Sequence, residues 1–113
     1  MPAPERLRRS QDFAAAMRRG RRARLPLLTL VASRTDRPVT RAGFAVSRRV
    51  GGAVVRNRLK RRLRMAMRAL PWRPGFDVVV VPQPECASAR YEEVSGALEQ
   101  AAHKLSLLNT DNH

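Results

Sequence analysis

The chain of 113 residues has one cysteine, two histidines and few aromatic side chains, and each shortage narrows what the protein can be. A single cysteine, Cys86, leaves no internal disulfide framework and no cysteine zinc cluster, so we expect a reducing, cytoplasmic setting. Aromatic residues make up only 4% of the chain, and the core must therefore be mainly aliphatic.

Long apolar runs and catalytic constellations are also lacking. No run approaches the roughly 18 apolar residues that a membrane span needs, and the first ten residues lack the apolar segment of an export signal. His103 and His113 have no clustered carboxylate or cysteine, so we predict no metal site. No serine, cysteine or lysine lies near a plausible base and orienting acid, so we predict no catalytic residue in the chain.

Acidic residues are absent from the middle of the chain. Residues 1–36 hold nine basic and three acidic side chains, residues 37–76 twelve and none, and residues 77–113 two and six. A net charge of +14 indicates a polyanionic partner. A GC-rich genome would explain arginine in place of lysine, but it would not remove acids from one window.

The hydrophobic pattern predicts a single α+β domain. We expect a helix from Ser10, capped there and closed at Gly20, and another that Ser88 caps. The long helix at 54–70 ends at Pro71, and Trp72 beyond it is expected to cover the edge of the core. Strands are expected at 27–33, with room for a short one before Pro26, at 42–47 and at 76–81. The first two should form a hairpin, the third should be central, and the helices should pack against one sheet.

The helix at 54–70 has two contrasting faces. At about 100° per residue, its apolar stripe consists of Val55, Leu59, Leu63, Ala66 and Leu70. The opposite face carries Asn57, Lys60, Arg61, Arg64 and Arg68, flanked by Arg56, Arg58 and Arg62. No carboxylate stands three or four residues from these cations, so each like-charge pair costs about 0.2 to 0.5 kcal/mol. A partner rich in phosphate would compensate this cost.

Three interpretations other than nucleic-acid binding apply to such a helix: a face that is only solvated, a calmodulin-binding type of helix, and a helix that binds an anionic membrane. The membrane interpretation is weakened because the apolar stripe is needed for packing against the sheet. No helix-turn-helix pair, zinc ligand set or heptad accompanies it, which favours RNA over a DNA major groove.

The segment GFAVSRRVGGAVVRNRLKRRLR, residues 43–64, resembles the protein subunit of bacterial ribonuclease P. The motif residues are Gly43, Ser47, Arg48, Arg49, Gly51, Arg56, Asn57, Arg58, Lys60, Arg61 and Arg64. The segments RLRRSQDFAAAMRRG and YEEVSGALEQAAHKL resemble the first and last helices of that family, so the resemblance covers nearly the whole chain.

The resemblance implies a two-layer α/β sandwich with about four strands and three helices, and a ribosomal-protein-like fold. Its βαβ crossover would be left-handed, whereas the general rule gives the opposite hand. The implied function is that of an accessory subunit of an endoribonuclease, which binds the catalytic RNA and helps remove the 5′ leader from precursor tRNA. The catalytic groups would lie in the RNA. Mg²⁺ would be held by that RNA and the substrate, not by the protein alone, and no obligate protein partner is implied.

The resemblance also assigns two sets of residues within one RNA-binding domain, 1–113, in which we expect disorder at 1–5 and 109–113. The catalytic RNA would contact Arg48, Arg49, Arg56, Asn57, Arg58, Lys60, Arg61, Arg64 and Arg68. The leader would lie in a cleft with Phe13, Met17, Arg18, Val31 and Ser47. Without the resemblance, Phe13 is equally well an ordinary core residue. A ribosomal or ribosome-assembly protein and a nucleoid DNA-binding protein remain as alternatives.

Overall fold

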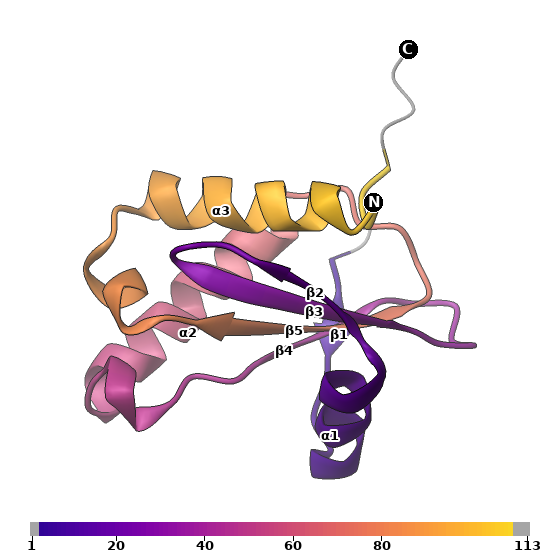
Figure 1. The fold of residues 1–113 in the computed structure, drawn as a ribbon, viewed down its shortest axis with the longest axis horizontal. Coiled ribbons are helices and arrows are strands. Elements are labelled where there is room, and N and C mark those ends of the chain that lie inside the picture. Colours follow the sequence, from indigo (N-terminus) through magenta and orange to yellow (C-terminus); the bar gives the residue numbers. More distant parts are fainter. Residues whose placement is uncertain (1–2, 110–113) are drawn as a thin grey trace.

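The computed structural model describes residues 3–109. The chain folds into a five-stranded sheet with helices on both faces (Figure 1). Two short 3₁₀ helices, η1 and η2, precede α2 and α3. In chain order the elements are β1 (Glu5–Arg6), α1 (Ser10–Arg19), β2 (Arg21–Arg24), β3 (Leu28–Arg34), β4 (Arg41–Phe44), η1 (Arg48–Val50), α2 (Ala53–Arg68), β5 (Phe76–Pro82), η2 (Pro84–Ser88) and α3 (Tyr91–Lys104).

The strand order is β1-β4-β5-β3-β2, with β5 in the middle. β5 pairs antiparallel with β3 and parallel with β4, which confirms the central strand and corrects the expected hairpin between the strands at 27–33 and 42–47. The physical reason is the run of valines in β5, which is apolar on both faces and needs a neighbour at each edge. The sheet also has five strands instead of about four, because β1 and the short β2 both join it.

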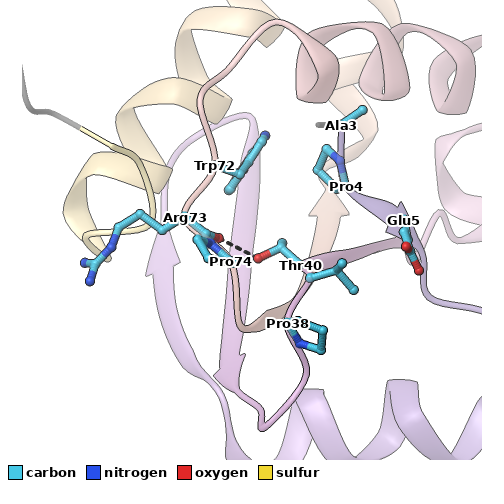
Figure 2. Close-up of a pocket in the computed structure, with 9 residues that line it drawn as sticks. Ala3, Pro4, Glu5, Pro38, Thr40, Trp72, Arg73 and Pro74 are labelled. Atoms are coloured by element: carbon cyan, nitrogen blue, oxygen red, sulfur yellow. Dashed lines mark hydrogen bonds between the residues drawn. The ribbon is translucent and has the colours of Figure 1, made fainter. Parts of the chain in front are cut away.

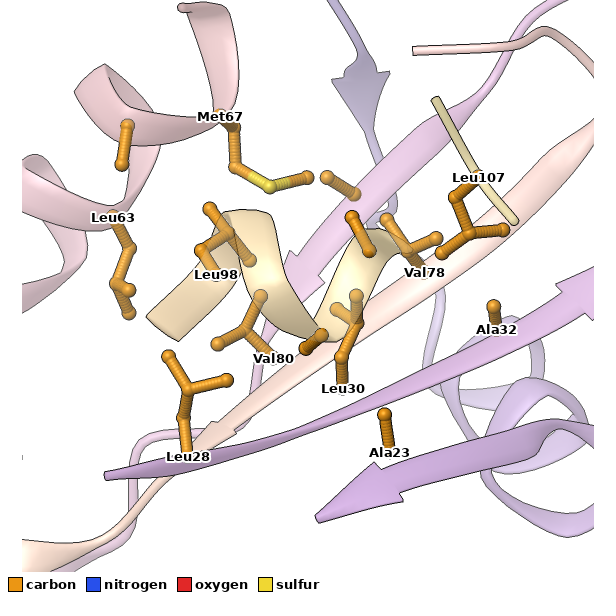
Figure 3. Packing of buried hydrophobic residues seen from close by; sticks show 14 of the residues in the cluster. Ala23, Leu28, Leu30, Ala32, Leu63, Met67, Val78, Val80, Leu98 and Leu107 are labelled. Carbon is orange, nitrogen blue, oxygen red and sulfur yellow. The ribbon is translucent and has the colours of Figure 1, made fainter. Parts of the chain in front are cut away.

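Alternate residues of the central strands face different helices. Leu28, Leu30, Val78 and Val80 belong to the larger core with α2 and α3, where Leu63 and Leu98 pack over them (Figure 3). Val31 and Val79 face the other way, against α1. The helices therefore pack against one sheet, as expected, with α2 and α3 on one face and α1 on the other (Figure 1).

The helix starts differ from the expected ones. α1 begins at Ser10 itself, its N-cap Arg9 makes no side-chain cap, and Gly20 closes the helix as expected. α3 begins at Tyr91, because Ser88 lies in η2 and its hydroxyl donates to the carbonyl of Glu85. The carboxylate of Glu93 accepts the backbone N–H of Arg90 at 2.9 Å and supports this later start.

The parallel strands β4 and β5 are connected through η1 and α2, as a βαβ unit requires. Gly51 makes the turn into α2 with a φ of 154°, and a Cβ there would lie 2.8 Å from Cγ1 of Val55. A side chain at this position would therefore clash as well as strain the backbone. The left-handed sense of the crossover stays a prediction.

Both ends of the described chain are held by backbone hydrogen bonds. The N–H of Glu5 donates to the carbonyl of Thr40 at 2.9 Å, and the N–H of Asn109 donates to the carbonyl of Pro71 at 2.8 Å. The disorder expected at 1–5 and 109–113 stays a prediction. Residues 1–2 and 110–113, which include His113, lie outside the described residues.

Trp72 covers the core edge, as the sequence predicted. Its side chain is 4% exposed, and its Nε1 donates to the carbonyl of Met67 at 2.7 Å. Beside it, an apolar hollow of about 290 Å³ lies between the N-terminal segment and the loops before β4 and β5 (Figure 2). The hydroxyl of Thr40 donates to the carbonyl of Arg73 at 2.6 Å and joins these two loops.

A partly buried network of ion pairs links the sheet to α1. Arg41 on β4 donates from Nε and Nη2 to the two carboxylate oxygens of Asp77 on β5, at 2.8 and 2.6 Å, and from Nη1 to Asp12 at 3.3 Å. The hydrogen bonds to Asp77 raise the pKa of Arg41 above its ordinary value. Asp12 lies in the first turn of α1 and also belongs to this network.

We predict that Arg41→Gln lowers the free energy of unfolding by about 3 kcal/mol, because it leaves the Asp77 carboxylate buried without its charged partner. Chemical denaturation would measure the loss. Arg37→Gln is the matched control, since Arg37 is exposed and should change stability by less than about 0.5 kcal/mol. Equal stability of the two variants would contradict the structural role of the pair.

Candidate nucleic-acid interface

The apolar stripe of α2 faces the core, as its spacing predicted. Leu59, Leu63 and Ala66 are buried, and Val55 packs at the margin of the same cluster. Met67 is also buried, although it was not placed on the stripe. Met67 follows Ala66 on the side of α2 that faces the sheet, and its flexible thioether side chain packs into the same core.

The cations of α2 divide into bound and free groups. Arg56 donates from Nε to the carbonyl of Gly51 at 3.2 Å, and Arg62 donates from Nη1 to the carbonyl of Ala89 at 3.0 Å. Both guanidinium groups therefore help to hold the fold. The remaining residues of the face keep open side chains: Asn57, Arg58, Arg61 and Arg68 are exposed, and Lys60 and Arg64 are half-buried.

No carboxylate neutralises this face. Between residues 3 and 109, the ion pairs are those of Arg41 with Asp12 and Asp77 and that of His103 with Glu99, so none involves α2. The first turn of α2 contains no acidic residue, and its N-cap Gly52 offers no side-chain acceptor. The positive end of the helix dipole therefore adds to the charge of the face.

Arg64 has the least favourable environment of these cations. Its Nε is buried without a hydrogen-bond partner, and its guanidinium carbon lies 5.8 Å from the centre of the Phe44 ring. Burial lowers the pKa of Arg64, and the positive charges of Arg6, Arg68 and Arg61 lower it further. An anion bound to the accessible part of this guanidinium group would offset the repulsion.

A groove of about 370 Å³ joins the two predicted sets of residues. It runs between α1, β4 and α2, and its lining brings Phe13 together with Lys60 and Arg64. The ring of Phe13 lies over Gly43, where a Cβ would be 2.3 Å from Cζ of the ring. Glycine at this position therefore allows the aromatic ring to form part of the groove.

Arg6, Arg8 and Phe44 also line this groove and were not predicted from the sequence. Arg6 and Arg8 stand in the basic run before the first helix, and Phe44 follows Gly43 in the motif itself. The run of basic residues was a signal, but its position beside β4 depends on β1, a two-residue strand that no periodicity reveals.

The other predicted cleft residues are dispersed. Val31 is fully buried between the sheet and α1, so its assignment to the cleft surface is wrong. Its alternation along β3 turns it toward the helix, which covers it. Met17 is half-buried against the same cluster. Arg18 and Ser47 are exposed but do not line the groove of Phe13, and Arg48 and Arg49 are exposed in η1, just before α2.

Within the part of the chain that the structure describes, no group of three or more histidine, cysteine, aspartate or glutamate side chains is placed to hold a metal ion. None of the helices between residues 3 and 109 has both the length and the apolar character that crossing a bilayer requires.

The fold and the site define a class: a small, basic α+β protein that presents one carboxylate-free cationic helix from a covered sheet. Comparison with known proteins makes this specific. The family model described as Ribonuclease P matches residues 1–106. The ribonuclease P protein component of Streptomyces avermitilis is 48% identical, over 93% of this chain and 94% of that protein. That of Acidothermus cellulolyticus is 44% identical, over 94% and 92%.

Solved structures agree with this assignment. The ribonuclease P protein of Thermotoga maritima has a TM-score of 0.75 at 28% identity and covers 85% of this chain and 93% of its own. The Staphylococcus aureus protein shares the fold with a TM-score of 0.82 at 19% identity, over 92% of this chain and 97% of its own. The chain belongs to the family of ribonuclease P protein components, the protein subunits of a ribonuclease complex.

We predict that Arg64→Met raises the free energy of unfolding by about 0.5 to 1 kcal/mol, because it removes like-charge repulsion while the methionine still packs on Phe44. Thermal and chemical denaturation in low salt would measure the gain. Arg19→Met is the control: Arg19 is exposed in the last turn of α1, where a cation is favourable, so its loss should not stabilise. Destabilisation by Arg64→Met would show that this cation has a structural role.

Proposed function

We propose that the chain binds the catalytic RNA of ribonuclease P through α2 and helps this RNA to remove the 5′ leader of precursor tRNA. The observation that carries the proposal is the cationic face of α2, which is free of ion pairs while the opposite stripe is buried. Family membership supports the RNA as partner. A cytoplasmic location is part of the same proposal.

Contact with the RNA would depend mainly on phosphate. The guanidinium groups of Arg58, Arg61 and Arg68 are exposed and match phosphate oxygens in a bidentate geometry. Asn57 adds a side-chain amide that can bind a phosphate, a ribose hydroxyl or a base edge. Arg48 and Arg49 extend the charge from η1. Arg56 already donates to Gly51, so its role is to hold the turn that aims the start of α2.

The leader would enter the groove between α1, β4 and α2. Phe13 offers a half-exposed ring on which one base can stack, a contact worth about 1 to 3 kcal/mol. Around the ring, Arg6, Arg8, Lys60 and Arg64 supply cations for the adjoining phosphates. Leader and catalytic RNA would then meet at Lys60 and Arg64, which belong both to the groove and to α2.

The chain's residues would bind and orient, and the hydrolysis itself would belong to the RNA. Mg²⁺ would come with that RNA and the precursor tRNA. By neutralising phosphates at the junction of enzyme and substrate, the cations of α2 and of the groove would reduce the Mg²⁺ concentration that assembly needs.

Reconstitution tests the proposal. Added to ribonuclease P RNA, the chain should restore cleavage of precursor tRNA at low Mg²⁺. With about six phosphates contacted, the logarithm of the binding constant should fall with the logarithm of salt concentration with a slope of roughly −4 to −5. Replacing Arg61, Arg64 and Arg68 by alanine should flatten that slope by about 2 to 2.7, because each lost phosphate contact removes about 0.7 to 0.9.

The circular dichroism spectrum of the triple variant should match that of the unmodified chain, because none of its three residues is in the buried stripe. A melted spectrum would instead mark these residues as structural. Failure to stimulate cleavage at any salt concentration would contradict the proposed function. Cosedimentation with ribosomal subunits in place of ribonuclease P RNA would favour a ribosomal role.

Phe13→Leu should weaken binding of precursor tRNA to the reconstituted enzyme about tenfold, because leucine keeps the apolar packing but cannot stack on a base. Binding of mature tRNA, which has no leader, should be unchanged and is the internal control. Ala14→Leu tests for a non-specific effect, since Ala14 is exposed on the same helix. An equal loss for both RNAs would place Phe13 in the core only.

A further inference from the structure

Val54 and Met65 are the large apolar side chains that stay exposed among residues 3–109, at 71% and 55%. Both belong to α2 and are separated by eleven residues, which is about three turns or 16 Å along the axis. At 100° per residue they share one stripe, directly opposite the buried one. A single exposed apolar residue needs no explanation, but two on one stripe of the cationic helix suggest a common use.

Cationic and polar side chains separate these two residues. Arg58 and Arg61 occupy the same stripe, and Asn57 stands beside it. A shallow hollow of about 320 Å³ is lined by Val54, Asn57, Arg58 and Arg61. The surface that α2 offers is therefore mixed, with an apolar contact at each end and guanidinium groups between.

We propose that α2 contacts the sugars or bases of its RNA partner as well as the phosphates, and that Val54 and Met65 make the apolar part of this contact. The inference rests on the proposed function. Apolar side chains gain nothing from a row of charged oxygens, whereas ribose C–H groups and base faces are apolar surfaces that they can cover. The wide, shallow minor groove of an RNA helix and its unstacked loop bases both expose such surfaces next to phosphates.

A lipid surface fits this stripe less well. Insertion into a bilayer interface requires a continuous apolar face, and here the two apolar residues are divided by Arg58 and Arg61. The continuous apolar stripe of α2, which includes Leu59 and Leu63, is already buried against the sheet and α3. Mixed apolar and cationic contacts spaced along the helix match nucleotides better than lipid.

The test uses Val54→Thr and Met65→Gln, singly and together, in the full chain. Both changes retain size and helix propensity, and both sites are exposed, so helicity and Tm should not change. The probe is the ribonuclease P RNA of Streptomyces avermitilis, with binding measured over a range of salt concentrations. The double variant should bind about fivefold more weakly at every salt concentration with an unchanged log–log slope, because apolar contacts release no counterions.

Arg61→Gln is the matched control on the same stripe, and it should flatten the slope by about 0.7 to 0.9. Superimposed binding curves for the double variant and the unmodified chain would overturn the inference, and so would a changed slope. Weaker binding to vesicles of phosphatidylserine and phosphatidylcholine, with RNA binding intact, would assign the stripe to a membrane instead. If the unmodified chain itself fails to bind this RNA, the proposed function fails first.

Discussion

The burial of one stripe of α2 against the sheet and α3 is the interaction on which the other features depend. Without it, a sixteen-residue helix with no acidic side chain would be opposed by repulsion of a few tenths of a kcal/mol per like-charge pair. Leu59 and Leu63 are almost completely buried, and burying a leucine contributes about 1.5 to 3 kcal/mol. The packing term therefore exceeds the repulsion, and the fold can present a concentrated cationic surface without neutralising it.

The arginines of this chain carry the same charge, but they have different structural roles. Arg41 donates hydrogen bonds to Asp77. Arg56 donates to the carbonyl of Gly51, and Arg62 donates to the carbonyl of Ala89. Arg64 is held over Phe44 with its Nε unsatisfied. The exposed arginines of α2, which are Arg58, Arg61 and Arg68, can bind a partner without giving up such a contact. The exposed arginines therefore do not lower the stability of the fold, whereas Arg64 does. The position of Arg64 beside the groove is explained by function more readily than by stability.

The α2 helix, its two faces and the central strand could be predicted from sequence because each depends on local periodicity or a continuous apolar run. The pairing of strands could not, because β5 separates β3 from β4 only after α2 returns the chain to the sheet. Val31 was misplaced for a related reason: alternation fixes that it lies opposite Leu30, but not which face α1 covers. The groove residues Arg6 and Arg8 depend on the pairing of β1 with β4, a tertiary contact of two residues that leaves no pattern.

The groove forms because β1 is short and because the residue beside Phe13 is a glycine. β1 pairs with β4 only as far as Ala42, so the chain leaves the sheet edge there and turns into α1. The next residue is Gly43, and the space that its side chain would occupy holds the ring of Phe13. Phe44 packs on the α2 side of the sheet while Phe13 packs on the α1 side, and the two layers meet at this edge. In a chain with few aromatic residues, two of its three phenylalanines are thus placed where the cations of α2 reach the groove.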